Sequence, residues 1–313
     1  MANQSRSVPR MGARLPRALL VLGALATGVA AAVGATVADD EIAAVRAWRA
    51  ERVTEIAGED GWLTVVGLHW LKPGANSFGR ARDNDVALQS VALAPHAGRF
   101  VVDGRSVRLE PTSPSGLTVD GRAAESREVA PSAERDGVVL AAGSLRLFVI
   151  ERGGRFALRV RDLESRARRN FRGLDYFPID PSWAVEARFE RYEPARTVPI
   201  VNVLGDEIEM LAPGAIIFSR DGREWRLDAL LEAAGDDHLF VMFADGTSGH
   251  ETYGAGRFLH VPLPSGPTVR VDFNEAYNPP CAFTGFATCP LPPPQNRLEI
   301  AIRAGEVRYD AGH

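Results

Sequence analysis

The chain has 313 residues, of which 45% are hydrophobic, 24% charged and 8% aromatic, and its formal net charge is −4. A mildly acidic chain lacks the concentrated basic surface that nucleic acids require, so we expect no nucleic-acid partner. The length allows one large hydrophobic core or two moderate ones.

The first part of the chain, residues 1–38, predicts an export signal. Four arginines and no acidic residue precede an apolar run from Ala18 to Val33, and Thr36 and Ala38 have the spacing that signal peptidases accept. The alternative is an uncleaved N-terminal membrane anchor, because residues 18–38 approach the ~20 residues that span a bilayer. The run is rich in Gly, Ala and Thr rather than Leu and Ile, which favours a cleaved signal. We therefore expect a secreted or periplasmic protein with no stable membrane span after cleavage.

Residues 39–60 predict an N-terminal helix. Hydrophobic residues recur at helical spacing between Asp39 and Ala57. Asp39 or Asp40 is suited to the N-cap, and Gly58 to the position that ends a helix.

Beyond Gly61 the pattern changes to short alternating runs with turn signals every eight to twelve residues, which is typical of all-β proteins. Hairpins are predicted at Asp103-Gly104, Gly153-Gly154 and Asp221-Gly222, because X-Gly pairs suit the turns that match strand twist. Further strands are predicted at Trp183–Tyr192, Leu239–Phe243, Phe258–Val261, Thr268–Phe273 and Arg297–Ile302.

The β-rich part is expected to form two units. A break near Arg161–Pro181 divides it into a β-sandwich over residues 61–165 and a second antiparallel β unit over residues 166–313. A second short helix is predicted from Leu227 to Ala234. The predicted fold class is therefore mainly β, with an N-terminal helix, a sandwich and a second antiparallel unit.

One basic stretch runs from Arg159 to Gly173. It can be read as an anion site or as a solvated loop, and we prefer the loop because charge runs usually face water. A tryptophan set can be read as a ligand-binding face or as core, and we prefer core because aromatic side chains dominate β cores. These are Trp62, Trp70, Trp183 and Trp225.

Both cysteines of the chain, Cys281 and Cys289, lie in a proline-rich segment, residues 276–298. In an oxidising compartment we expect them to form a disulfide that closes the loop between them. A metal pair is less favoured, because such pairs have closer spacing and need two more ligands. A nucleophilic thiol is also less favoured, because it needs a histidine base nearby.

Polar residues concentrate between Asp245 and Asn278, beside this loop. In the predicted strand, Val269, Val271 and Phe273 share one face while the polar residues share the other. We therefore expect a polar cleft on the second β unit, walled by the cysteine and proline loop.

The cleft residues suggest roles in ligand binding, and in hydrolysis if the protein is an enzyme. Asp272 and Glu251 are the candidate catalytic acid–base pair. Arg257 would pair with Asp272 across strands or hold an anion, and Tyr277 and Asn278 would orient the ligand. Structural ion pairs and turn caps are the alternative for each of these residues.

A metal site is a weaker interpretation of the same region. His250, Glu251 and His260 have suitable side chains, but the histidines are ten residues apart and cannot share a helical face. We expect neither a metal nor another cofactor.

The segments "VDFNEAYNPPCAFTGFATCPLPPPQNRLEIAIRAGE", "DGTSGHETYGAGRFL" and "DGWLTVVGLHWLKPGANSFG" resemble the family called domain of unknown function 1684. The resemblance extends over about Trp48 to Glu306 and implies no established activity. It does imply which residues belong to the family motifs. They are Asp245, Thr247, Tyr253, Gly256, Arg257, Asp272, Asn274, Tyr277, Asn278, Cys281, Cys289, Asn296 and Glu306. Of these, the candidate ligand-binding residues are Asp245, Thr247, Tyr253, Arg257, Asn274, Tyr277, Asn278, Asn296 and Glu306.

A second stretch is similar to a forkhead-associated β-sandwich, a phosphothreonine reader. Gly79-Arg80, Asn84-Asp85 and His96 fall in similar order. Leu93 stands where that family has a serine, and Asp120-Gly121 replaces its final Asn-Gly. This similarity therefore bears on fold more than on binding.

The sequence thus favours an exported protein that binds a small polar ligand in a cleft of its C-terminal β unit, with hydrolysis as an option. The alternative is a non-catalytic envelope interaction module that uses the forkhead-like half. An acid–base pair in a concave site would favour the enzyme, whereas buried structural pairs and an exposed patch elsewhere would favour the module.

Overall fold

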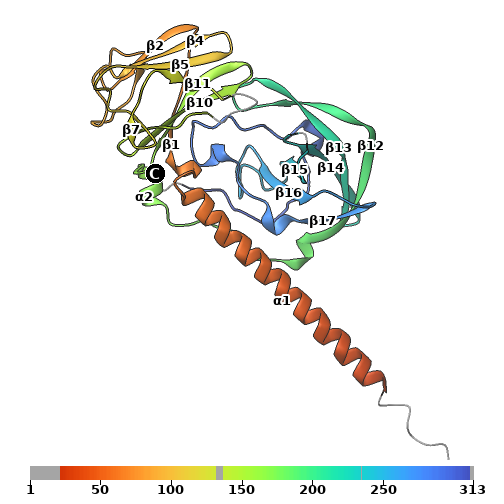
Figure 1. Cartoon of the computed structure of the whole chain (residues 1–313). Coiled ribbons are helices and arrows are strands. Elements are labelled where there is room, and N and C mark those ends of the chain that lie inside the picture. The colour runs from red at the N-terminus through yellow and green to blue at the C-terminus, as the bar shows by residue number, and fades with distance from the viewer. Residues whose placement is uncertain (1–21, 132–136, 234, 311–313) are drawn as a thin grey trace, which may run out of the picture. The chain divides into compact units, whose positions relative to one another are not determined.

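The computed structural model describes residues 22–131, 137–233 and 235–310. It divides into two compact units, residues 1–44 and 45–313. Helix α1 (Leu22–Ala57) is followed by a chain built mainly of antiparallel strands, so the predicted fold class is confirmed (Figure 1).

Helix α1 ends at Ala57, as the sequence predicts, but it begins at Leu22. Asp39 and Asp40 therefore lie inside the helix and do not cap it. Of the predicted export signal, residues 1–21 lie outside the described residues. Within the described part of the chain, no helix is both long and apolar enough to cross a membrane.

The N-terminal β region contains two sheets of six and five strands. In spatial order the first comprises β1 (Val65–Trp70), β11 (Arg155–Asp162), β10 (Leu145–Arg152), β9 (Leu140–Ala142), β6 (Thr118–Val119) and β7 (Arg122–Ala123). The second comprises β3 (Val86–Ala87), β2 (Gly74–Gly79), β4 (Gly98–Asp103), β5 (Ser106–Pro111) and β8 (Arg127–Glu128).

These two sheets share one hydrophobic core. Phe78 and Phe100 of the second sheet belong to the same buried cluster as Leu147 and Leu158 of the first, and the two phenylalanine rings lie 4.7 Å apart. The predicted hairpins at Asp103-Gly104 and Gly153-Gly154 both form, the second joining β10 to β11.

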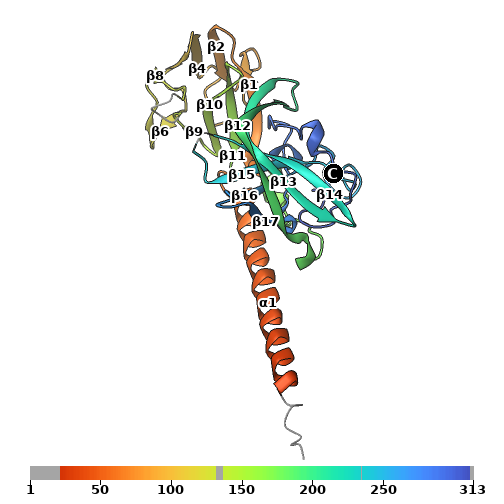
Figure 2. The ribbon, with the colours of Figure 1, turned by 90° about the vertical axis from the view of Figure 1, so that its right-hand side faces the viewer.

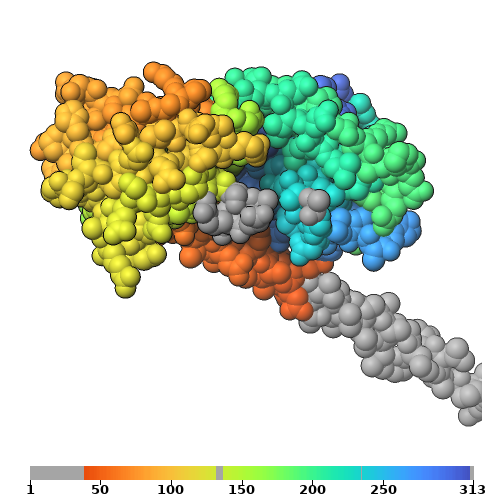
Figure 3. Space-filling view, turned by 45° about the horizontal axis from the view of Figure 1, so that its top comes forward, coloured from red at the N-terminus to blue at the C-terminus, as the bar shows by residue number. Residues whose placement is uncertain are grey.

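The C-terminal β region is one six-stranded, strongly curved sheet (Figure 2). Its strands in spatial order are β16 (Arg257–Pro262), β15 (His238–Phe243), β14 (Arg223–Leu231), β13 (Glu207–Arg220), β12 (Ala184–Val201) and β17 (Thr268–Asp272). Phe258 of β16 exchanges two backbone hydrogen bonds of 2.9 Å with Tyr277, which follows β17. This bridge brings the two edges of the sheet together into a nearly closed barrel. In Figure 3 the two β regions lie side by side, the first in orange and yellow and the second in green and cyan.

Both faces of the C-terminal sheet are buried, and alternate residues serve the two faces. Leu239, Val241 and Phe243 belong to one hydrophobic cluster. Phe240 and Met242 belong to another. We call the first the sealed face and the second the pocket face.

Burial on both faces explains why one sequence prediction is wrong. Residues 227–234 were expected to form a helix, but β14 runs through Leu231. Leu227 and Ala229 pack on the sealed face and Leu230 on the pocket face. The run is therefore mostly apolar without a clear period of two, and such a run does not distinguish a buried strand from a helix.

The expected strand at Arg297–Ile302 does not form either. The segment is extended and makes only a single bridge, between Ala244 and Arg297. Leu298 and Ile302 instead cover the sealed face. The predicted shared face of Val269, Val271 and Phe273 is confirmed, because all three are buried there.

The remaining elements are short. They are η1 (Trp62–Thr64), α2 (Arg166–Asn170), η2 (Pro181–Trp183), η3 (Phe273–Glu275), η4 (Pro280–Ala282) and η5 (Pro294–Asn296).

Candidate functional site

Many of the polar residues that the sequence places in a cleft form a buried network at the sealed face. Arg257 is 0% exposed, and its Nη2 donates to Asp245 at 2.7 Å. The same guanidinium donates to the carbonyl oxygens of Ile302 and Ala304. Arg257 therefore pairs with Asp245 and not, as the strand alternation suggested, with Asp272.

Asp245 is held from several sides. Thr247 donates to it from its backbone N–H at 2.7 Å and from its hydroxyl at 2.6 Å. The Thr247 hydroxyl also meets that of Thr252 at 2.8 Å. Burial lowers the pKa of Arg257, and the adjacent Asp245 carboxylate opposes that shift. The Asp245 carboxylate and both terminal nitrogens of Arg257 have partners within the protein, so this buried pair serves the structure, although the Arg257 Nε is buried without a described partner.

A second buried pair connects helix α1 to the C-terminal segment that follows η5. Arg52 Nε donates to Glu306 at 3.2 Å, and the backbone N–H of Asn278 donates to the same carboxylate at 2.7 Å. Burial raises the pKa of Glu306, with Arg52 opposing the shift. Asn278 Nδ2 in turn donates to the carbonyl of Val307.

The other predicted residues also have structural partners. Asn296 donates to the carbonyl oxygens of Asp228 and Met242, and accepts from the Asp228 N–H. Asn274 bonds to Asp272, which caps η3.

Glu251, the other candidate catalytic residue, belongs to neither of these buried pairs. It pairs with Arg303 at 2.9 Å, and its side chain is partly exposed. Neither Glu251 nor Asp272 is among the described residues that line the cavity at the pocket face or the smaller one beside Arg80.

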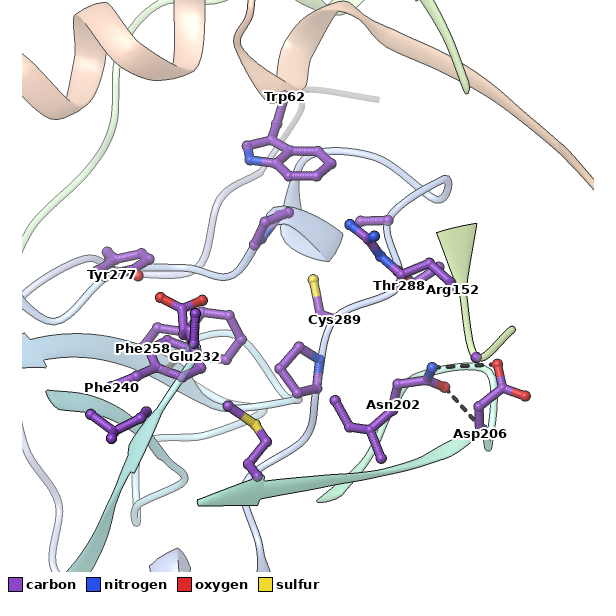
Figure 4. Close-up of a pocket in the computed structure, with 18 of the residues that line it drawn as sticks. Trp62, Arg152, Asn202, Asp206, Glu232, Phe240, Phe258, Tyr277, Thr288 and Cys289 are labelled. Carbon is purple, nitrogen blue, oxygen red and sulfur yellow. Dashed lines mark hydrogen bonds between the residues drawn. The ribbon is translucent and has the colours of Figure 1, made fainter. Parts of the chain in front are cut away.

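A cavity with a volume of about 640 Å³ lies at the pocket face, and this volume is within the usual range for small-molecule sites. We call it the Arg159 pocket. Its walls come from the end of α1, the β10–β11 hairpin, the curved sheet and the cysteine and proline loop. Figure 4 shows ten of the residues that line it, namely Trp62, Arg152, Asn202, Asp206, Glu232, Phe240, Phe258, Tyr277, Thr288 and Cys289.

The pocket has an apolar side and a polar side. Phe240 and Phe258 pack edge to face with ring centroids 4.8 Å apart, and Trp62 closes the cavity opposite Cys289 (Figure 4). At the other end, Asn202 hydrogen-bonds to Asp206. A ligand with both an apolar body and a polar group fits such a lining.

Arg159 is the distinctive residue of this cavity. It lies in the middle of β11 and is only 5% exposed, and its guanidinium carbon lies 5.2 Å from the centroid of the Trp62 ring. Its Nε is buried without a hydrogen-bond partner, and no described residue makes a hydrogen bond or ion pair with its guanidinium. Burial, together with the nearby Arg152 and Arg161, lowers the pKa of Arg159 to about 10. The group is therefore still cationic at neutral pH.

Cys289 lines the same cavity, and Cys281 lies next to Cys289. Both are free thiols in the structure, and the backbone N–H of Cys281 donates to Cys289 Sγ at 3.1 Å. The Tyr253 hydroxyl donates to the Cys281 carbonyl. A hydrogen bond from Cys289, assisted by one from Tyr253, lowers the pKa of Cys281 to about 7, whereas the pKa of Cys289 is raised.

The structure regroups the candidate metal ligands. His250 and Glu251 do not gather with His260; among the described residues the group that does is Glu232, His238 and His260. Sequence spacing gives no hint of this group, because His238 and His260 lie on β15 and β16 and Glu232 follows β14.

Of the residues predicted to bind a ligand, Tyr277 lines the pocket, and Cys289, which was predicted to form a disulfide, lines it as well. Sequence reasoning missed Arg159, which was assigned to a solvated stretch. The available signal was its position inside the predicted β10–β11 hairpin. There it lies between Leu158 and Val160, which strand alternation places on the opposite face of the strand.

The sequence model of the family described as "Protein of unknown function (DUF1684)" matches residues 169–307. This match includes the sealed network and the cysteine and proline loop. It does not extend over residues 48–168, so the resemblance there, including that to a forkhead-associated sandwich, stays a prediction.

An uncharacterized protein of Haloarcula marismortui, whose structure was solved by solution NMR, is 36% identical to this chain. The match covers 47% of this chain and 81% of that one, with a TM-score of 0.40. Among proteins with curated descriptions, none matches. Through residues 169–307, the chain belongs to the DUF1684 family of proteins of unknown function.

Proposed function

We propose that the chain is an exported protein that binds a small organic anion in the Arg159 pocket. The observation that carries the proposal is Arg159 itself, a buried guanidinium without a protein acceptor. Leaving a charge buried and unpaired costs several kcal/mol, on the order of what breaking a buried pair costs. An anionic ligand would supply the missing acceptors.

The geometry narrows the ligand class. A guanidinium presents a planar fork of donors that suits a carboxylate or a phosphate. Trp62, Phe240 and Phe258 offer an apolar surface beside it. We therefore favour a carboxylate or phosphate ester with an aromatic or aliphatic body over a bare inorganic ion.

Hydrolysis by Asp272 and Glu251 receives no support from their positions, because Asp272 caps η3 and Glu251 pairs with Arg303. The proposal is therefore one of binding. Any chemistry at this site would involve the groups that line it, such as Tyr277 and Cys289.

Thermal shift and calorimetry on the full chain test the proposal, using aromatic and aliphatic carboxylates and their phosphate-ester counterparts. A ligand at a hundredfold excess over its dissociation constant stabilises the native state by about 2.7 kcal/mol. Arg159→Met should abolish that stabilisation. Arg108→Met, at an exposed strand position of the same β region, is the matched control and should keep it.

Two outcomes would contradict the proposal. One is that no member of the panel binds. The other is that Arg159→Met and Arg108→Met retain binding equally. Either result would favour the alternative, a non-catalytic envelope interaction module.

Export carries a consequence for the thiols. In an oxidising compartment, a thiol–disulfide oxidoreductase would take two electrons and two protons from Cys281 and Cys289, and a sulfur–sulfur bond would close their loop. The hydrogen bonding between the two side chains supports this pairing. Mass spectrometry of the secreted chain without reductant tests it: a mass lower by two hydrogens is expected, and two free thiols on exported protein would contradict it.

A further inference from the structure

Glu232, His238 and His260 lie close together: His238 is on β15, His260 is on β16, and Glu232 directly follows β14. Leu230 of β14 is paired with Phe240 of β15, and Phe240 with His260 of β16. His238 is two residues from Phe240 on β15, and residues two apart on a strand share a face, so both histidines belong to the pocket face. Glu232 comes one residue after the end of β14 and lines the Arg159 pocket.

The ligand atoms of this group are already close together. His260 Nε2 lies 3.3 Å from Glu232 Oε2, and His238 Nε2 lies 3.9 Å from the same oxygen. All three ligand atoms fall within 4.8 Å of one another. Zinc–ligand lengths of about 2.0–2.1 Å place the ligands of a tetrahedral site roughly 3.3 Å apart. Only small rotations of these partly exposed side chains would complete such a site.

The ring nitrogens that face away from Glu232 have partners of their own. His238 Nδ1 lies 2.8 Å from Asp237 Oδ1, and His260 Nδ1 lies 3.4 Å from the Tyr277 hydroxyl. A proton on each Nδ1 would donate to these oxygens and leave both Nε2 lone pairs directed at one point. Metal-binding histidines almost always have such partners, which fix the ring orientation.

The surroundings also hold the rings in place. The two imidazoles meet edge to face with centroids 4.6 Å apart, and His260 packs against Phe240 and Tyr277. Glu232 and Tyr277 both line the Arg159 pocket. The group therefore adjoins that cavity through Glu232 and through Tyr277, which packs against His260.

We propose that Glu232, His238 and His260 bind a divalent transition-metal ion of the zinc class at the rim of the Arg159 pocket. Two imidazoles and one carboxylate are the donor set of catalytic rather than structural sites, which leave a position open for water or a ligand. The partial exposure of all three side chains gives the ion a route of entry. This proposal does not rest on anion binding by Arg159, since no ligand atom is shared between the two.

Isothermal titration of the full chain with Zn²⁺ measures the stoichiometry, and the visible spectrum with Co²⁺ reports the coordination. We expect one ion per chain. His260→Ala and His238→Ala should each weaken binding by at least about tenfold, since each removes a direct ligand. Asp237→Asn, which alters only the partner of His238, should weaken it by roughly 10–100-fold.

His250→Ala is the matched control, because His250 is exposed and belongs to the same C-terminal region but not to the group. It should leave the affinity unchanged. Equal losses in His250→Ala and His260→Ala would overturn the assignment, as would wild-type protein that binds no more Zn²⁺ than the His238→Ala, His260→Ala double variant. Circular dichroism confirms that each variant is folded.

Discussion

The two faces of the C-terminal sheet each have a buried arginine close by, but the two arginines have opposite surroundings. Arg257, at the sealed face, donates to one carboxylate and to carbonyl oxygens. Arg159 reaches the pocket face from β11 and has no described acceptor. Burial of a cation is therefore not by itself a sign of function. Burial of a cation without an acceptor is a stronger indication, because the desolvation of the charge then destabilises the fold without compensation.

The largest expected effect is on the sealed face. Arg257→Met should leave Asp245 buried and unpaired and lower the free energy of unfolding by about 3–5 kcal/mol. Urea denaturation measures this loss. Arg303→Met, which removes the exposed partner of Glu251, should change little. Similar losses in the two variants would mean that the buried network does not hold this face together.

The next effect concerns Asn296, which is 0% exposed and satisfies backbone groups of Asp228 and Met242. Asn296→Leu should lower the free energy of unfolding by about 2–4 kcal/mol, because these groups stay buried without partners. Gln295→Leu is the control, since Gln295 also bonds to Asp228 but is exposed. A loss for Gln295→Leu as large as that for Asn296→Leu would contradict the prediction.

On the pocket face, removal of the arginine should raise the free energy of unfolding instead of lowering it. Arg159→Met removes an unpaired buried charge and keeps most of the side-chain volume, so the ligand-free protein should become more stable by about 1–2 kcal/mol. Denaturation without added anions is the measurement. A clear loss of stability would show that Arg159 already has an acceptor and would make the two faces alike.

The smallest effect concerns the thiols. The pKa of Cys281 is lowered to about 7 by the hydrogen bond from Cys289, and the thiolate is the reactive form. Alkylation of the reduced protein by iodoacetamide should therefore increase as the pH rises through about 7, below the ~8.5 of an ordinary cysteine. Cys289→Ala removes the donor and should move the midpoint upward. An unmoved midpoint would contradict the assigned cause.

Local signals predicted much of the fold. The hairpin at Asp221-Gly222 forms because both residues adopt positive φ, 55° and 73°, as a tight turn between twisted strands requires. Helix α1 ends at Ala57, directly before Gly58, as the sequence predicts, although Gly58 does not adopt a positive φ. These features depend on a few adjacent residues, which a sequence displays directly.

The pocket could not be predicted in this way, because it depends on contacts between distant segments. Arg159 becomes buried only when Trp62 and the C-terminal sheet cover β11. His238 and His260 meet only through the register of β15 with β16. The concentration of polar residues between Asp245 and Asn278 indicated the C-terminal region. It could not distinguish polar residues that hydrogen-bond to each other from polar residues that face a cavity.

Strand β16 places Arg257 and Phe258 next to each other in the chain but on opposite faces of the sheet. A residue of the buried network and a residue that lines the pocket are thus direct neighbours along one strand. Substitutions at the pocket-facing positions can therefore change the lining of the cavity while the arginine that holds the other face stays untouched. The lining of the pocket and the framework of the sheet can accordingly vary independently of each other.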